Sequence, residues 1–149
     1  MQTDKIGFWG TEGSYGCFSN FYPCTFQFNG RTFNCSEQAF MWMKAVTFGD
    51  FEISEQILEE VDPKKIKKLG RKVKNFSEEQ WSQVSYDIML QINLAKYSFN
   101  PDLKNILLGT KDAYLYENSP FDYKWGVGKT GNGKNLLGKV LMEVRERLK

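Results

Sequence analysis

Apolar and polar residues alternate in the two runs CTFQF and RTFN, which fill most of residues 24–34 on either side of Asn29-Gly30. Alternation with period two is typical of a strand with one buried face. Asparagine and glycine both tolerate the positive φ angles that a tight type I′ turn requires. The pattern therefore predicts a β-hairpin in the first third of the chain.

Most of the remaining chain has apolar residues at helical spacing, and the segments begin with residues that favour helix starts. Ser, Asp and Asn can accept hydrogen bonds from free backbone amides, and proline suits the first helical position. Ser77 with Gln80 matches a capping box. The expected helices run from Ser36 to about Phe48, from Asp50, from Asp62-Pro63, from Ser77 to about Phe99, from Asn100-Pro101 to Gly109, and from Asn135 onward.

Residues 113–117, AYLYE, read as one further strand. The chain shows no internal repeat, low-complexity tract or linker, and 149 residues suffice for one hydrophobic core. We therefore expect an α+β protein, a predominantly helical single domain over residues 1–149. Its small antiparallel β-sheet would come from the N-terminal third and the 113–117 strand.

Composition narrows the chemistry, since the chain contains no histidine. Acid–base work near neutral pH would fall to Asp, Glu, Lys, Tyr or Cys, and no ordinary zinc site can be built.

Three cysteines without CxxC spacing indicate reduced thiols. The N-terminus lacks a signal-like apolar run, and no stretch reaches membrane-spanning length. We expect a cytoplasmic protein without a membrane partner. Its net charge of +2 is too small to indicate nucleic-acid binding.

Glu37 and Lys44 are seven residues apart in the largely apolar segment SEQAFMWMKA, so they project from nearly the same side of the expected helix. A buried carboxylate and amine are costly unless they are paired or used. One interpretation is an ion pair or two side chains that reach solvent. The other is a pocket in which Glu37 holds a base or ribose and Lys44 is a desolvated nucleophile.

The segment ENSPFDYKWGVG, residues 117–128, combines two carboxylates, an indole, a proline and two glycines, and cannot be regular structure. Asp122 close to Trp125 places a carboxylate beside an aromatic platform, which suits chemistry on a sugar joined to a flat base. Earlier in the chain, SNFYP indicates a rigid loop in which Ser19 and Asn20 either bind substrate oxygens or close a turn.

Glycines and lysines follow in GVGKTGNGKN, residues 126–135. The run mimics a dinucleotide fingerprint and a P-loop, but Asn135 stands where a P-loop needs Ser or Thr, and too little chain follows for a βαβ unit. Exposed amides with Lys129 and Lys134 could hold a phosphate, or could form a solubilised flexible loop. Likewise, KKIKKLGRKVK at 64–74 is either a surface helix or a phosphate-steering face.

The motifs together resemble the YbiA-like, or NADAR (NAD and ADP-ribose), family. The resemblance extends over nearly the whole chain in order, and the SPxDxxWGxG block is specific. Five segments and three single residues carry the resemblance. They are SNFYP (19–23), SEQAFMWMKA (36–45), KKLGRKVKNF (67–76), Trp81 with Met89 and Lys96, ENSPFDYKWGVG (117–128) and NLLGKVLMEVRERL (135–148). Many relatives have Glu-His where this chain has Glu37-Gln38.

The resemblance implies a YbiA-like fold and an N-glycosidase. It points to phosphorylated ribosylamino-pyrimidines of riboflavin biosynthesis, or to ADP-ribosylated guanine, free or in nucleic acid, as substrates. It implies catalytic roles for Glu37, Lys44 and Asp122. Substrate binding is expected from Asn20, Tyr22, Glu117, Trp125, Gly126 and Lys129. No metal, cofactor or obligate protein partner is expected. The alternative is a non-catalytic ADP-ribose or NAD-binding module.

Overall fold

The computed structural model describes residues 4–149 and confirms a mostly helical α+β fold. Within these residues, the elements follow one another as β1 (Lys5–Phe8), a 3₁₀ turn (Gly16–Phe18), β2 (Phe26–Phe28), β3 (Arg31–Phe33), α1 (Ser36–Thr47), α2 (Phe51–Glu59), α3 (Pro63–Gly70), α4 (Glu78–Phe99), α5 (Pro101–Gly109), β4 (Tyr114–Glu117) and α6 (Leu136–Arg147).

The predicted hairpin is present as the antiparallel pair β2–β3, in which Phe26 pairs with Phe33. Asn29 and Gly30 at its tip have φ angles of 51° and 76°, as a type I′ turn requires. Phe26 and Phe33 are both fully buried, whereas Gln27 and Thr32 between them face outward. The predicted hairpin is therefore confirmed, and its alternation reflects one buried face.

Three of the predicted helix starts are confirmed by cap hydrogen bonds. Asp50 accepts from the Ile53 amide, Asp62 from the Lys64 amide and Ser77 from the Gln80 amide. The start of α1 differs by one residue. Its N-cap is Cys35, which makes no side-chain cap, and Ser36 is the first helical residue.

The sequence had suggested one small antiparallel sheet that included residues 113–117. Strand β4 does not join the hairpin in such a sheet. It pairs in parallel with β1, from Lys5 opposite Tyr114 to Phe8 opposite Glu117. A parallel pair needs a long crossover, and the hairpin with helices α1–α5 provides it. The two strands end at the same edge, so the segments that follow Phe8 and Glu117 leave the sheet side by side. Ligands commonly bind at this end of parallel strands.

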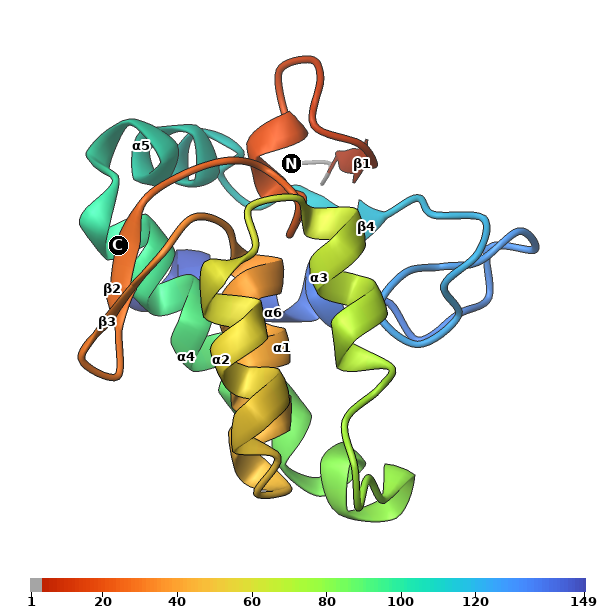
Figure 1. Ribbon diagram of the computed structural model, residues 1–149. Coiled ribbons are helices and arrows are strands. Elements are labelled where there is room, and N and C mark those ends of the chain that lie inside the picture. The colour runs from red at the N-terminus through yellow and green to blue at the C-terminus, as the bar shows by residue number, and fades with distance from the viewer. Residues whose placement is uncertain (1–3) are drawn as a thin grey trace.

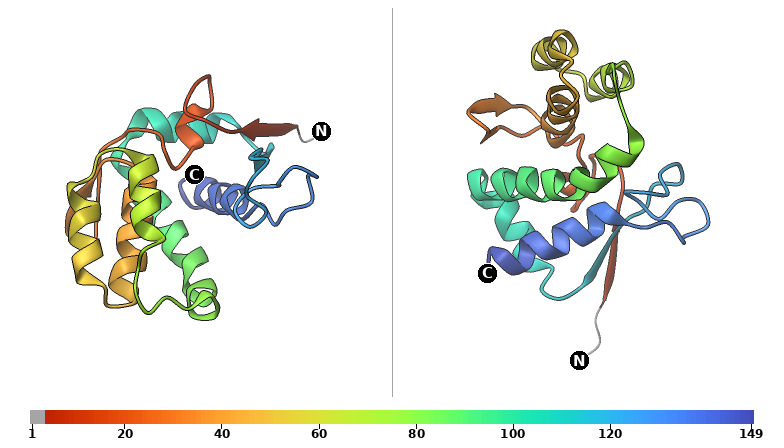
Figure 2. Two further views of the ribbon diagram at one scale, coloured as in Figure 1. Left: turned by 45° about the vertical axis from the view of Figure 1, so that its right-hand side comes forward. Right: turned by 90° about the horizontal axis from the view of Figure 1, so that it is seen from below.

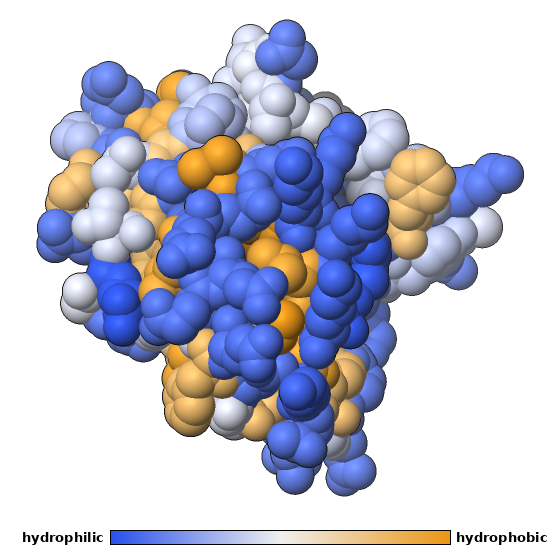
Figure 3. Space-filling model, viewed as in Figure 1, coloured by the Kyte–Doolittle hydropathy of each residue, from blue (hydrophilic) through white to orange (hydrophobic). Residues whose placement is uncertain are grey.

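Helix α1 is central to the packing. It contacts α2 and α3 on one side and α4 on another, while α4 contacts α6 and α6 contacts β4 (Figures 1 and 2). Hydrophilic residues cover most of the outward face of α2 and α3, with hydrophobic atoms visible between them (Figure 3). Among residues 4–149, no helix has the length and apolar character needed to cross a membrane.

Candidate active site

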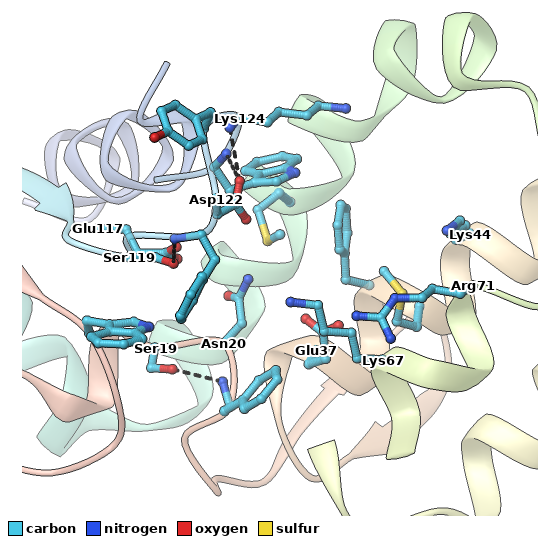
Figure 4. Close-up of a pocket in the computed structure, with 18 of the residues that line it drawn as sticks. Ser19, Asn20, Glu37, Lys44, Lys67, Arg71, Glu117, Ser119, Asp122 and Lys124 are labelled. Carbon is cyan, nitrogen blue, oxygen red and sulfur yellow. Dashed lines mark hydrogen bonds between the residues drawn. The ribbon is translucent and has the colours of Figure 1, made fainter. Parts of the chain in front are cut away.

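A pocket of about 840 Å³ lies where five parts of the chain meet. Its walls come from the segment after β1, the loop around Ser19–Phe21, one face of α1, the α3 end with the start of α4, and residues 117–125 after β4. Figure 4 shows Glu37, Lys44, Lys67 and Arg71 on the helical side and Glu117, Asp122 and Lys124 on the opposite side. This volume lies within the range of small-molecule sites.

Helix α1 contributes Glu37 and Lys44 to one wall of the pocket, together with Phe40 and Met41. Their spacings of three, four and seven residues place them on one helical face. The Glu37 side chain is 7% exposed. Within residues 4–149, Glu37 and Lys44 form no ion pair with each other or with any other charged group. The structure therefore favours the pocket interpretation over a paired, structural role.

Burial raises the pKa of Glu37 to about 7, because a carboxylate ion is poorly solvated in this environment. Lys67, Lys44 and Arg71 favour the ionised form and limit the rise, while the charge of Asp122 adds to it. Glu37 therefore exchanges its proton near neutral pH, which is the range in which a general acid or base works best.

The Lys44 ammonium group lies over the ring of Phe76, with its Nζ atom 4.4 Å from the ring centroid. Partial burial lowers the pKa of Lys44, whereas Glu78 and Glu37 act in the opposite direction. An amine in such a place is neutral more often than a solvated lysine, and only a neutral amine is nucleophilic.

Asp122 is held by its own loop. Its Oδ1 atom accepts hydrogen bonds from the amides of Lys124, at 2.9 Å, and Trp125, at 2.8 Å. Oδ2 has no hydrogen-bond partner within the described part of the chain. One oxygen thus fixes the orientation of the carboxylate and the other is available to a ligand.

Glu117 ends β4, and its backbone is clamped to the loop that returns towards α6. Its amide donates to Asn135 Oδ1 at 3.0 Å, and its carbonyl accepts from the Val127 amide at 2.9 Å. Burial raises the pKa of Glu117 to about 7, assisted by the charges of Asp122 and Glu37. The charge of Asp122 therefore raises the pKa of both Glu37 and Glu117 across the pocket.

Trp125 forms part of an aromatic wall. Its ring packs edge-on against Phe40 of α1, with centroids 5.3 Å apart, and Phe40 in turn contacts Trp81 of α4 at 5.1 Å. The indole is thus supported from behind by two other helices. A flat base could lie against such a wall.

The Ser19–Asn20 loop reaches the pocket because α1 and α4 both bind it. The Asn20 carbonyl accepts from the Glu37 amide at 2.9 Å. Behind the loop, the fully buried Lys96 donates to the carbonyls of Cys17, at 2.7 Å, and Ser19, at 3.4 Å. Asn20 Oδ1 is enclosed and has no partner among residues 4–149, so it can accept a hydrogen bond from a ligand.

Six of the residues expected from the sequence meet in this pocket, namely Glu37, Lys44, Asp122, Asn20, Glu117 and Trp125. Three others do not line it. Tyr22 packs against the core, and Lys129 is exposed on the loop, where its amide bonds to the Tyr123 hydroxyl. Gly126 is buried behind the wall, where an added Cβ would lie 2.9 Å from Glu117 Oε2.

Gln38 also points away from the pocket. Its side chain accepts from the Asn34 amide and donates to the carbonyls of Ile57 and Glu60 at the end of α2. The position next to Glu37 is therefore structural in this chain.

Sequence reasoning did not select several residues that line the pocket. Lys67 and Arg71 lay within a basic run that was ambiguous as a whole, although their spacing of four already placed them on one helix face. Trp9 and Phe121 form an exposed edge-to-face pair with centroids 6.0 Å apart. They come from the segments after β1 and β4, and the unpredicted parallel pairing brings them together.

Comparisons with known proteins agree with this architecture. The family model described as the NADAR domain matches residues 7–149. Protein irg-1 of Caenorhabditis elegans is 42% identical, over 88% of this chain and 74% of that protein. N-glycosidase R617 of Acanthamoeba polyphaga mimivirus is 39% identical, over 98% of both chains. The NMR structure of the E. coli protein YbiA superimposes with a TM-score of 0.88 at 35% identity, covering 99% of this chain and 86% of that one. This chain therefore belongs to the NADAR domain family.

Proposed function

We propose that this protein is an N-glycosidase that hydrolyses the C1′–N bond between a phosphorylated ribose and a base. The observation that supports it most directly is the convergence of Glu37, Glu117, Asp122 and the Lys44 amine on one aromatic-walled pocket. Relatives that match nearly the whole chain bear the name N-glycosidase, including R617 and YbiA of E. coli.

Cleavage of a C1′–N bond develops positive charge on the sugar, which a nearby carboxylate stabilises. Asp122 fits this role, since hydrogen bonds to Oδ1 hold it in place while Oδ2 is open. It would either stabilise the charged sugar or activate the attacking water. In the overall reaction, water delivers hydroxide to C1′ and a proton to the departing nitrogen.

Proton transfer falls to Glu37 and Glu117, whose pKa values are both raised to about 7. One such carboxyl group can hold a proton at neutral pH and deliver it to the leaving nitrogen, while the other remains ionised. Asn20 and Glu37 would also bind the ribose hydroxyl groups. Trp125 would stack on the base or cover the sugar.

Lys44 offers a second route. A ring-opened ribose presents C1′ as an aldehyde or imine, and a neutral amine can capture it as a Schiff base with loss of water or of the base amine. Hydrolysis of that Schiff base then returns the lysine and the free sugar. The lowered pKa of Lys44 supports the presence of neutral amine.

The substrate is a phosphorylated ribosylamino-pyrimidine or ADP-ribosylated guanine. The deciding experiment incubates the protein separately with a ribosylamino-pyrimidine phosphate and with ADP-ribosylated guanosine or DNA, and measures the released base by chromatography. Glu37→Gln and Asp122→Asn serve as matched variants. Release of base that both variants lose supports the proposal and identifies the substrate. Tight binding without release would instead identify a non-catalytic ADP-ribose or NAD-binding module.

A further inference from the structure

We propose that Lys67 and Arg71 form an anion subsite that binds the phosphate on the 5′ oxygen of the ribose. This inference rests on the proposed function, because both substrate classes named above carry a phosphate at that position. It assigns a binding role to one face of α3 and a direction to the substrate within the pocket.

The local sequence explains how α3 presents these two cations. Lys67 and Arg71 are four residues apart, so they project side by side from the C-terminal end of the helix. Gly70 between them is buried against α1, where an added Cβ would clash with Met41 Sδ. Met41 is one turn beyond Glu37. The close approach at Gly70 therefore places both cations next to the Glu37 carboxyl group (Figure 4).

Within residues 4–149 neither cation forms an ion pair, although both lie near enough to Glu37 to favour its ionised form. Among residues 4–149, no carboxylate lies within ion-pairing distance, 4.0 Å, of Lys67 or Arg71. Lys124 on the opposite wall does have a partner, Glu78, at 3.2 Å. Lys67 Nζ lies near the Phe21 ring at the pocket edge, 6.0 Å from its centroid. Two adjacent unpaired donors, one of them a guanidinium fork, suit a phosphate.

The distribution of charge across the pocket gives the ligand its direction. Glu117 and Asp122 lie on the wall opposite α3, and their negative charge repels a phosphate. Lys67 and Arg71 attract it to the helical side. A ribosyl phosphate bound in this direction places its phosphate against α3 and its C1′ atom towards Glu117 and Asp122 on the opposite wall. Reversal would bring the phosphate dianion into contact with Asp122.

The simpler interpretation is that both side chains are ordinary solvated surface cations. The same basic segment provides a pair of control residues that can test this interpretation. Lys68 and Lys72 follow one position later on the same segment, with the same charges. They line a different groove, between α2 and α3, together with Glu59 and Glu60. A general electrostatic effect of the basic run would depend equally on both pairs, whereas a subsite depends on Lys67 and Arg71 alone.

The test measures binding by titration calorimetry at pH 8 for wild type, Lys67→Gln/Arg71→Gln and Lys68→Gln/Lys72→Gln. The probes are ribose, ribose 5-phosphate and ADP-ribose. We expect the Lys67/Arg71 variant to bind the phosphorylated probes at least about tenfold more weakly and ribose unchanged. The Lys68/Lys72 variant should remain within about twofold of wild type for all three. Circular dichroism verifies that each variant is folded.

If the Lys67/Arg71 variant loses affinity for ribose 5-phosphate, the subsite binds a terminal phosphate. If it loses affinity for ADP-ribose alone, the subsite binds a diphosphate. The subsite proposal would be overturned if both double variants lost affinity for the phosphorylated probes equally, or if neither lost any. A wild-type protein that does not prefer the phosphorylated probes to ribose would also overturn it. Binding requires no turnover, so the outcome is independent of the hydrolase test. Absence of base release would sink the proposed activity while leaving this result standing.

Discussion

The carboxylate of Asp122 accepts a hydrogen bond of 2.8 Å from the backbone amide of Trp125, three residues further along the chain. The same oxygen accepts from Lys124, so one side chain organises the turn that presents the indole. Asp122 is therefore expected to act in two ways. Its negative charge acts on the ligand, and its hydrogen bonds to the Lys124 and Trp125 amides hold the loop.

Replacement of Asp122 separates these two roles. Asp122→Asn retains an oxygen that can accept both amides, and we expect base release to fall at least about 100-fold with little change in stability. Asp122→Ala should lose activity and also about 2 kcal/mol of the free energy of unfolding, because both amides lose a charged acceptor. Steady-state kinetics and urea unfolding measure the two effects. Activity of Asp122→Asn within about tenfold of wild type would show that the charge is not catalytic.

Glu37 should make the stability of the protein depend on pH. Its pKa is about 7 in the folded protein against an ordinary value of 4.5, so the folded state binds more protons than the unfolded state between these pH values. The free energy of unfolding must then fall as pH rises from about 4.5 to about 7.

Glu37→Gln tests this contribution, since glutamine resembles the protonated acid at every pH. We expect the variant to match wild type near pH 4.5 and to exceed its free energy of unfolding by about 2–3 kcal/mol at pH 8. Urea unfolding at several pH values measures the difference. A difference that does not change with pH would mean that Glu37 ionises normally. Glu117 remains in both proteins, so only the part of its contribution that depends on the Glu37 charge differs between them.

Lys44 can be tested as a nucleophile by reduction with borohydride in the presence of substrate. A Schiff base would be trapped as a stable adduct, which peptide mass spectrometry should locate on Lys44. Lys44→Arg should form no adduct because its guanidinium remains charged. Lys68→Gln is the control and should still be labelled, because Lys68 lines a different groove. An adduct on Lys67, or none on the wild type, would exclude Lys44 from covalent catalysis.

Gly126 supports the site from behind the pocket wall. An added Cβ would lie 2.9 Å from the Glu117 carbonyl oxygen and 3.0 Å from that of Asp122, and backbone atoms cannot easily move away. We expect Gly126→Ala to lower base release at least about tenfold and to destabilise the protein by about 1–3 kcal/mol. Gly109→Ala is the matched control, because nothing lies within 4 Å of its Cβ position. If both variants behaved alike in the kinetic assay, the tight fit at Gly126 would have no bearing on the site.

Gln38 and Glu37 are neighbours with separate tasks. Gln38→Ala should lower the free energy of unfolding by about 2–4 kcal/mol, because it removes several buried hydrogen bonds to the end of α2 and the Asn34 amide. The turnover number of the folded fraction should stay within about twofold of wild type, in contrast to Glu37→Gln. A large loss of turnover in Gln38→Ala without a loss of stability would contradict this separation.

Local rules were sufficient for much of the fold. Asn29-Gly30, Asp50, Asp62 and Ser77 act through atoms close in sequence, so their turns and caps could be predicted from residue type alone. The parallel pairing of β1 with β4 could not, because it joins strands from opposite ends of the chain. A four-residue strand such as Lys5–Phe8 has too few residues for its alternation to be informative.

The same distinction applies to the site. Glu37 and Lys44 could be paired from their spacing on a helix, and Asp122 with Trp125 from their shared loop. Nothing local indicated that Lys67 and Arg71 turn inward while Lys68 and Lys72 do not. That depends on the buried contact of Gly70 with Met41, which becomes apparent only when α3 is packed on α1.

The parallel joining of β1 to β4 also bears on how the protein is made. A nascent chain leaves the ribosome N-terminus first, so it displays the α1 acid and amine well before the residues that face them from the far end. An assembled site requires the C-terminal stretch to dock, and we expect the long sequence separation between the two paired strands to slow folding.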